Sequence, residues 1–201
     1  RPAFVPTSII GIDLGIKDLI VTSYNEKIEN NIKLNTKRMV GLQRGLSRCK
    51  KGSKNRYKMK LKIQRLYQKI RNARKHMIHD ITNKLINEND IIVTENLDVK
   101  SMQKNHYVAK GLNENPISEI IRVLKYKADW NNKRIIQIDR YYPSSQICNV
   151  CNYQNKEVKD LSIRNWECPV CHTEHERDYN AAVNIMFKGL EKYMLYLEQS
   201  I

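Results

Sequence analysis

Residues 142–184 contain the most informative pattern in this chain, beginning with YPSSQICNVC (142–151) and ending with CPVCHTEHERDYNAAVN (168–184). Two Cys-x-x-Cys pairs lie in this stretch, separated by sixteen residues. Each pair places two thiols on one tight turn, and two such turns facing each other enclose a metal in a tetrahedron of sulfurs. The spacing is typical of a structural zinc site. The sequence therefore predicts one structural Zn²⁺ held by Cys148, Cys151, Cys168 and Cys171.

Two disulfides in a secreted domain are the alternative for these cysteines. The regular spacing favours a metal, and RPAFVPTSII (1–10) lacks the basic segment and long apolar run of a secretory signal peptide. His172 and His175 are potential ligands, but four thiolates already complete the shell. Asn152 and His172 directly follow the two pairs, where such a turn favours a positive φ. Cys49, alone in a basic run, is expected to be a free intracellular thiol.

Positive charge is concentrated in one segment of the chain. The 201 residues carry 36 Lys and Arg against 21 Asp and Glu, a net charge of +15. Residues 37–75 hold 16 of the basic residues and no acidic ones, so the remainder has 20 basic against 21 acidic residues. Such a segment predicts a polyanionic partner. No apolar run approaches the roughly 18 residues that a membrane helix needs.

Hydrophobic periodicity predicts five strands and four helices. The strands are expected at residues 8–14, 19–23, within 27–34, at 90–95 and at 134–138. The helices are expected at residues 36–50, 56–88, 117–130 and 179–198. The first three strands are close enough in the chain to form an antiparallel meander. Residues 96–114 are expected to form a loop, in which Lys104, His106, Tyr107 and Lys110 suit contacts with a nucleic-acid backbone or base.

The helix expected at 56–88 has one apolar stripe, formed by residues such as Met59, Ile63 and Leu66, and basic residues on its other faces. A solvated helix face is the alternative, but such a face normally mixes charges of both signs. The absence of acidic residues favours contact with phosphates. The residues expected to make these contacts are Lys50, Lys51, Lys54, Arg56, Lys58, Lys62 and Arg65.

Three carboxylates stand at the ends of predicted elements. Asp13 ends the strand IIGID, Glu95 ends the strand IIVTE, and Asp178 opens the last helix. An acid in an apolar strand is costly unless it is paired or binds a cation, and only Lys17 lies near either strand acid in the chain. Capping of the turn before Gly15 is the alternative for Asp13. If the three acids converge, their repulsion favours a bound cation.

The segments that carry these acids resemble a known family. GIDLGIKDL (11–19), VTENLDVKSM (93–102) and CPVCHTEHERDYNAAVNI (168–185), with YPSSQIC (142–148), are similar to the three RuvC motifs and the zinc ribbon of TnpB (OrfB) proteins. These are transposon-encoded RNA-guided DNA endonucleases, to which type V CRISPR effectors are related. The resemblance covers the whole chain. It implies an α/β, RNase H-like (RuvC) fold with a mixed five-stranded sheet, flanking helices and an inserted zinc ribbon.

The resemblance also implies boundaries and partners. A nuclease core spans 1–141 with a basic helical insertion at 36–89, a zinc ribbon spans 142–176, and the last RuvC helix spans 177–201. The partners are a guide RNA and target DNA in the prokaryotic cytoplasm, with no membrane. The family normally has an N-terminal half that binds the guide RNA. Because this chain starts near the first motif, we expect a truncated or split protein, an excised nuclease domain or a minimal relative, with that half as a further partner.

For the chemistry, the resemblance implies that Asp13, Glu95 and Asp178 are catalytic acids. They would hold two Mg²⁺ or Mn²⁺ ions that promote hydrolysis of DNA phosphodiester bonds. Arg177 and Asn180 would contact the DNA phosphate. Two other functions stay open: a catalytically inactive nucleic-acid-binding protein, and an accessory zinc-ribbon protein of a transposition complex.

Overall fold

The computed structural model describes residues 5–30, 32, 36–102, 104, 109, 111–112 and 115–199. The chain divides into two compact units, one formed by Arg1–Glu29 with Ile81–Ile201 and the other by Asn30–Asp80. The second unit lies within the predicted helical insertion except for residues 30–35. Among the predicted contact residues, His106, Tyr107 and Lys110 lie outside the described residues.

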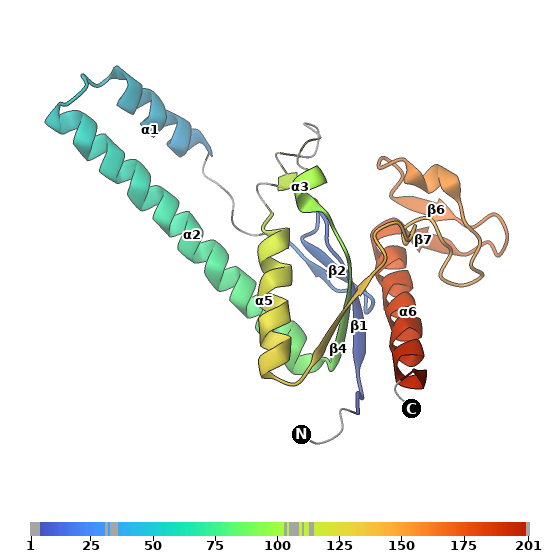
Figure 1. The fold of residues 1–201 in the computed structure, drawn as a ribbon. Coiled ribbons are helices and arrows are strands. Elements are labelled where there is room, and N and C mark those ends of the chain that lie inside the picture. Colours follow the sequence, from blue (N-terminus) through green and yellow to red (C-terminus); the bar gives the residue numbers. More distant parts are fainter. Residues whose placement is uncertain are drawn as a thin grey trace. The chain divides into compact units, whose positions relative to one another are not determined.

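The first unit is built on a mixed five-stranded sheet of order β3-β2-β1-β4-β5 (Figure 1). Strands β1, β2 and β3 form the predicted antiparallel meander, whereas β4 pairs in parallel with both β1 and β5. The predicted five-stranded mixed sheet is therefore confirmed. The strands are β1 (Ile9–Asp13), β2 (Ile20–Thr22), β3 (Lys27–Ile28), β4 (Ile91–Glu95) and β5 (Arg134–Ile138).

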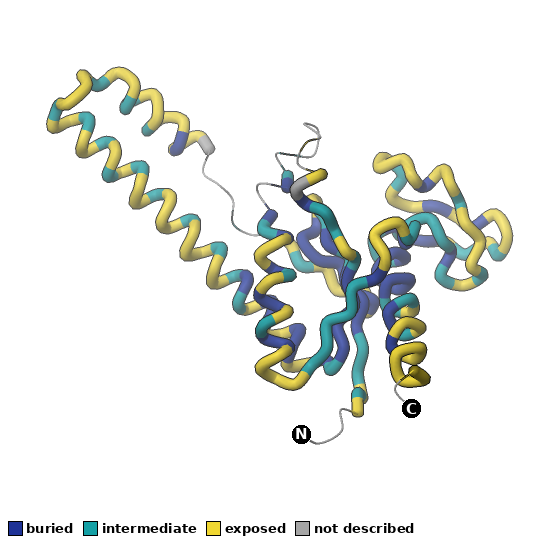
Figure 2. Tube along the Cα trace, viewed as in Figure 1, coloured by how far each residue is buried: buried dark blue, intermediate teal, exposed yellow. Residues whose placement is uncertain are grey.

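Helices α5 (Ile117–Trp130) and α6 (Arg177–Glu198) lie on opposite sides of this sheet (Figure 1). Two glycines allow α6 to pack closely on one face of the sheet. A Cβ added at Gly11 of β1 would lie 2.2 Å from the Ala182 carbonyl oxygen, and one added at Gly189 of α6 would lie 2.3 Å from Cγ1 of Val93. Figure 2 shows the buried residues concentrated in the strands and on the helix surfaces that meet them.

Several helix starts differ from the predictions, and at two of them a polar side chain caps the first turn. Asp98 accepts a hydrogen bond from the Ser101 amide (3.1 Å) and starts a short helix, α3 (Val99–Met102), inside the predicted loop. Ser53 accepts from the Arg56 amide (3.2 Å), so α2 (Lys54–Glu88) starts earlier than expected. Helix α6 also begins two residues before the predicted start at residue 179.

Residues 142–176, called here the cysteine module, have a small core of their own. Strands β6 (Asn165–Glu167) and β7 (Glu174–Glu176) pair antiparallel, and η1 (Lys156–Lys159) is a short 3₁₀ helix. The side chains of Val158 and Trp166 are buried against Cys148 and Cys168. The module leads directly into α6, whose first residue follows β7.

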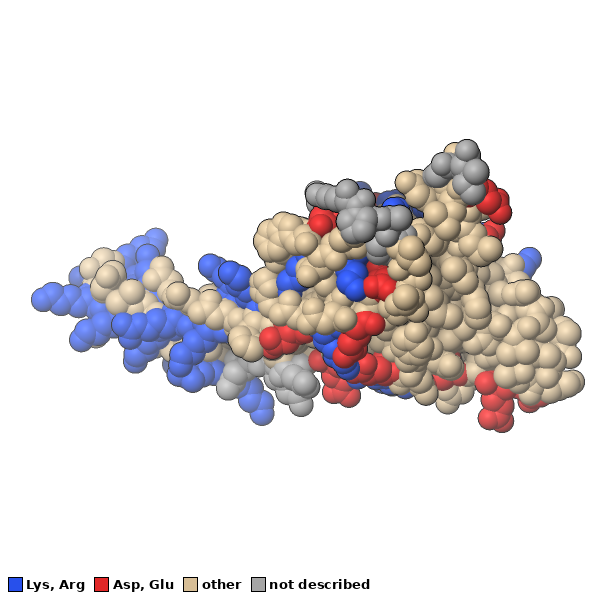
Figure 3. Space-filling view, turned by 90° about the horizontal axis from the view of Figure 1, so that it is seen from below, with Lys and Arg blue, Asp and Glu red and all other residues tan. Residues whose placement is uncertain are grey.

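The second unit is a helical hairpin formed by α1 (Thr36–Arg48) and the N-terminal part of α2. Nη1 of Arg56 donates to the carbonyls of Leu46 (2.9 Å) and Cys49 (3.3 Å), so it satisfies backbone acceptors where α1 ends. Figure 2 shows that most of the hairpin is exposed or half-buried. On the face shown in Figure 3, many Lys and Arg side chains lie along the hairpin, with other residues between them and no acidic residue among them.

None of the helices that the structure describes combines the length and the apolar composition needed to cross a bilayer.

Candidate functional site

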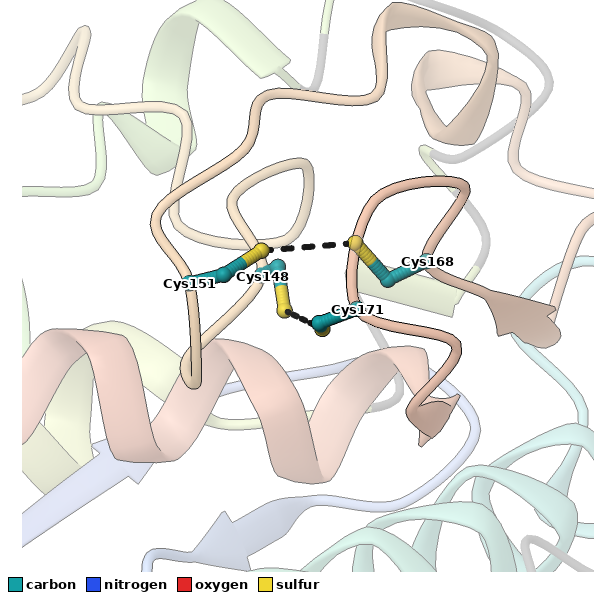
Figure 4. Close-up of side chains that lie close together, drawn as sticks. All are labelled: Cys148, Cys151, Cys168 and Cys171. Carbon is teal, nitrogen blue, oxygen red and sulfur yellow. Dashed lines mark hydrogen bonds between the residues drawn. The ribbon is translucent and has the colours of Figure 1, made fainter.

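The four predicted zinc ligands lie together (Figure 4). Their Sγ atoms all lie within 4.8 Å of one another. The Cys148 and Cys171 sulfurs are 3.6 Å apart, and the Cys151 and Cys168 sulfurs are 3.5 Å apart. A tetrahedron with Zn–S bonds of about 2.3 Å has sulfurs about 3.8 Å apart. The donor set and its spacing therefore fit a single tetrahedral zinc ion, so this cluster could hold such a metal.

Each pair of cysteines is presented by the same local turn. The amides of Asn152 and His172 donate to the carbonyls of Cys148 and Cys168, both at 2.9 Å. Asn152 has φ 63° and His172 has φ 57°. The predicted positive φ at both positions is confirmed, and it closes each turn so that the two thiols of a pair point the same way.

The four thiols differ in acidity, and the pKa of Cys151 is raised to about 12 by burial and by its hydrogen bonds with the other cysteine sulfurs. Hydrogen bonds from Thr173 lower the pKa of the Cys171 thiol to about 6, whereas burial raises the pKa of Cys148. A thiolate at neutral pH is the form that binds metal. His175 is closer to the cluster than expected of a bystander, because its Nε2 lies 3.1 Å from the Cys148 sulfur. His172 instead pairs with Glu167 at 2.9 Å.

The strand register brings two of the predicted acids to one face of the sheet. Strands β1 and β4 run in parallel with Ile12 opposite Thr94, so Asp13 and Glu95 follow side by side at the carboxyl ends. Gly11 faces α6, and side chains alternate along a strand, so Asp13 lies on the same face. These acids therefore end adjacent strands on the side covered by α6.

The third acid, Asp178, lies in the first turn of α6, one turn before Ala182, which packs on Gly11. Burial, and after it the charges of Glu95 and Asp178, together raise the pKa of Asp13 to about 8. The Arg177 guanidinium acts in the opposite direction. Asp13 thus lies close enough to both other carboxylates for their charges to act on it, and we call these three residues the acidic edge.

Two of these acids have partners that the sequence did not predict. Ser144 Oγ donates to Glu95 Oε1 at 2.5 Å, and burial raises the pKa of Glu95 despite this bond. Asp178 accepts from Arg164 Nη1 at 2.9 Å and from Arg177 Nε at 3.0 Å. Ser144 and Arg164 both belong to the cysteine module. Arg177 is adjacent to Asp178 in sequence, but the contacts of Ser144 with Glu95 and of Arg164 with Asp178 join residues far apart in the chain, so only the tertiary structure identifies them.

The carboxylates of the acidic edge are farther apart than the sulfurs of the cysteine cluster. Within the described ranges, the cysteines form the only group of three or more His, Cys, Asp or Glu residues whose ligand atoms all lie within 4.8 Å. The three acids therefore do not meet that distance in this structure. The role of Asp13, Glu95 and Asp178 as metal ligands stays a prediction.

Arg177 and Asn180 are occupied by contacts inside the chain. Arg177 is 8% exposed, and its Nη1 donates to the carbonyls of Leu161 (3.1 Å) and Ile163 (3.4 Å). Asn180 is fully buried and donates to the Ile147 carbonyl at 2.7 Å. Both side chains join the cysteine module to α6. Their nearness to Asp178 is the only feature of this geometry that supports the predicted contact with a DNA phosphate.

The predicted phosphate-binding residues are, with one exception, exposed on the helical hairpin. Arg56 is half-buried because it caps α1. Their binding of nucleic acid stays a prediction. The exposed residues are Lys50, Lys51, Lys54, Lys58, Lys62 and Arg65.

Comparison with known proteins identifies two matching family models. The model OrfB_IS605, described as "Probable transposase", matches residues 2–106. The model described as "Cas12f1-like, TNB domain" matches residues 118–185, which include the cysteine module. The chain is also similar to the solved "Cryo-EM structure of the Cas12f1-sgRNA-target DNA complex", with a TM-score of 0.65 at 22% identity, covering 92% of this chain and 51% of that one. This likeness shows that the two share a fold.

Two curated relatives match nearly the whole chain. The "Putative RNA-guided DNA endonuclease" of Streptomyces pristinaespiralis is 36% identical over 94% of this chain and 47% of the relative. The "Putative RNA-guided DNA endonuclease InsQ" of Escherichia coli K12 is 33% identical over 94% of this chain and 50% of the relative. The chain thus spans about half the length of these relatives. The resemblance to TnpB (OrfB) proteins is confirmed, and the chain belongs to the OrfB_IS605 family.

Proposed function

We propose that this chain is the RuvC-type nuclease portion of an RNA-guided DNA endonuclease, in which Asp13, Glu95 and Asp178 bind the catalytic metal. The observation that carries this proposal is that the three acids lie near the same end of the sheet, where burial and the charges of Glu95 and Asp178 raise the pKa of Asp13 to about 8. A carboxylate in such a place ionises readily only when a cation neutralises its neighbours. The names of the relatives support the same activity.

The residues of the acidic edge fit Mg²⁺ or Mn²⁺. Carboxylate oxygens are the ligands that these hard cations prefer. When bound, a pair of such ions supplies Lewis acidity and an activated water for phosphodiester hydrolysis. The sheet contributes rigidity, because Asp13 and Glu95 end adjacent hydrogen-bonded strands. Ser144, Arg164 and Arg177 hold oxygens of Glu95 and Asp178 in place.

The remaining parts of the chain take supporting roles in this proposal. The four cysteines hold one structural Zn²⁺ and form a zinc ribbon. The exposed basic residues of the helical hairpin contact the phosphates of guide RNA, target DNA or both. Targeting by a guide RNA is proposed for the whole protein and not for this chain alone, because the chain spans about half the length of the relatives.

The test is DNA cleavage with Mg²⁺ in a complex with guide RNA, assembled with the part of a relative that this chain does not span. Asp178→Ala should lose more than the roughly 100-fold that changes around metal ligands typically cost. The matched control is Asp129→Ala, an exposed acid at the end of α5, just before β5 begins. Cleavage by Asp178→Ala at the rate of the control would exclude Asp178 from the metal site.

One observation favours a second function, nucleic-acid binding without catalysis. Asp178 is already neutralised by ion pairs with Arg164 and Arg177, both at 2.9 Å. If these pairs persist when divalent ions are present, the acidic edge is a structural ion-pair network. The chain would then act as an inactive binding protein or as an accessory protein of a transposition complex. Salt-sensitive binding of nucleic acid without any metal-dependent cleavage would identify this function.

A further inference from the structure

The cysteine module reaches the acidic edge through a buried serine. Ser144 is 5% exposed, and its hydroxyl donates to Glu95 Oε1 at 2.5 Å. A carboxylate with one oxygen held by a hydroxyl has a restricted orientation, because rotation of the carboxylate would break the bond. Ser144 therefore determines where the remaining oxygen of Glu95 points.

The backbone that carries Ser144 is attached to α6. Asn184 Nδ2 donates to the Ser144 carbonyl at 2.8 Å and to the Ile147 carbonyl at 2.6 Å. Asn184 is 3% exposed, so these bonds are shielded from water. One side chain of α6 therefore holds both the Ser144 backbone and the residue directly before the first cysteine.

A second buried asparagine fixes the first cysteine turn on the same helix. Asn180 Nδ2 donates to the Ile147 carbonyl at 2.7 Å, and Asn180 Oδ1 accepts from the Asn149 amide at 3.1 Å. Asn149 lies inside the turn between Cys148 and Cys151. The turn that presents two metal ligands, the segment that carries Ser144 and the start of α6 are thus one hydrogen-bonded assembly.

We propose that Ser144 is a positioning residue for Glu95 and that metal binding by the four cysteines keeps it in place. The proposal rests on the proposed function, because it assigns Glu95 to a divalent-metal site. Its physical basis is that folding of a small cysteine module is coupled to metal binding. Without the metal, the 148–151 turn loses its connection to the second cysteine pair, the hydrogen bonds to Asn180 and Asn184 are the restraints that remain, and the Ser144 hydroxyl is held less firmly against Glu95.

The sheet itself does not depend on this restraint. Its core on the α6 side is formed by Ile91, Val93, Ile138, Ile185 and Tyr193, all outside the cysteine module. Loss of metal from the cysteines should therefore loosen Glu95 while β1 and β4 remain paired. This separation makes the proposal testable apart from global folding.

The test measures Mn²⁺ binding to the 201-residue chain loaded with zinc, by electron paramagnetic resonance of the free ion. Ser144→Ala should weaken the Mn²⁺ affinity roughly tenfold or more, the effect typical of groups that orient metal ligands. Ser145→Ala, at the adjacent residue, is the matched control and should bind as wild type does. Ser144→Thr, which keeps the hydroxyl, should restore most of the affinity. Zinc content and the midpoint of thermal unfolding, measured on each variant, show whether the fold is intact.

Two further variants connect the effect to Glu95 and to the cysteines. In a Glu95→Gln background, Ser144→Ala should cause no additional loss of Mn²⁺ affinity, because the two changes remove one interaction. Cys151→Ser should weaken Mn²⁺ binding in the same direction, and its combination with Ser144→Ala should be less than additive. The Glu95→Gln comparison remains informative even if Ser144→Ala lowers stability, because a loss of stability would weaken Mn²⁺ binding in both backgrounds.

The outcomes separate this inference from the proposed function. Wild-type Mn²⁺ affinity in a folded Ser144→Ala variant, or fully additive losses with Cys151→Ser, would overturn the inference and leave the proposed function standing. If the Asp13→Asn variant binds Mn²⁺ with the same affinity as the wild-type chain, the proposed function is overturned, and this inference with it.

Discussion

The cysteine cluster and the acidic edge are two candidate metal centres assembled in opposite ways. Each cysteine turn closes through hydrogen bonds within a few residues, and the sulfurs reach 3.5–3.6 Å across the cluster. The acids come from β1, β4 and α6, and their positions depend on strand register and helix packing. The cysteine site is organised locally, whereas the acidic site exists only in the folded unit. The negative charge of the acidic edge is balanced partly by Arg164 and Arg177.

The largest expected effect concerns the local site. Removing zinc should unfold the cysteine module and leave the five-stranded sheet paired, because structural zinc sites in small modules contribute about 10 kcal/mol or more of apparent binding energy. Hydrogen exchange measured with and without a strong chelator should show loss of protection in β6 and β7 and retention in β1 and β4. Elemental analysis of freshly purified, reduced protein should give one zinc per chain, and less than half an equivalent would contradict the assignment.

The next effect tests whether the acids act as a unit. Asp13→Asn, Glu95→Gln and Asp178→Asn should each reduce Mg²⁺-dependent cleavage more than roughly 100-fold, and combinations should not reduce it multiplicatively. Nucleic-acid binding should persist in all three variants. Near wild-type cleavage by any one variant would remove that residue from the centre and leave a two-acid site.

A smaller effect separates both centres from the source of nucleic-acid affinity. If the helical hairpin contacts phosphates, replacing Lys58, Lys62 and Arg65 together by Gln should flatten the dependence of binding on salt by about one unit per lost contact. Lys156→Gln with Lys159→Gln, two exposed lysines of the cysteine module, is the control. An unchanged salt slope in the triple variant would mean that the basic face is only solvated.

The smallest effect concerns the charge of the metal-free acidic edge. The raised pKa of Asp13, about 8 against 3.8, means that the folded state binds the proton more tightly than the unfolded state. Stability in the presence of a chelator should therefore fall as pH rises from about 4 to about 8. Screening at this half-buried position reduces the expected loss to about 2 kcal/mol.

The comparison for this effect is Asp13→Asn, which cannot ionise. Chemical denaturation should show the variant more stable than wild type at pH 8 and equal to it below pH 4. Added Mg²⁺ should narrow the gap at pH 8 by stabilising wild type only. Equal stabilities at pH 8 in chelator would show that the neighbouring arginines already neutralise the edge.

Short-range features of this molecule were predictable because residues close in the chain encode them. The bounds of α5 and β5 match the predicted 117–130 and 134–138. The two cysteine turns and the positive φ of Asn152 and His172 also follow from local chain geometry. The short helix α3 was missed because a single cap, Asp98, outweighed a weak local pattern.

The tertiary structure alone determined how the acids are held. The hydroxyl of Ser144 meets Glu95, and the guanidinium of Arg164 meets Asp178, although neither pair is close in sequence. These contacts exist because β4 lies beside β1 and because α6 packs directly on Gly11. This packing of α6 places the cysteine module, which directly precedes α6 in the chain, at the end of the sheet. Periodicity reports which face of an element is apolar, but the partner of a polar side chain depends on how separate elements pack.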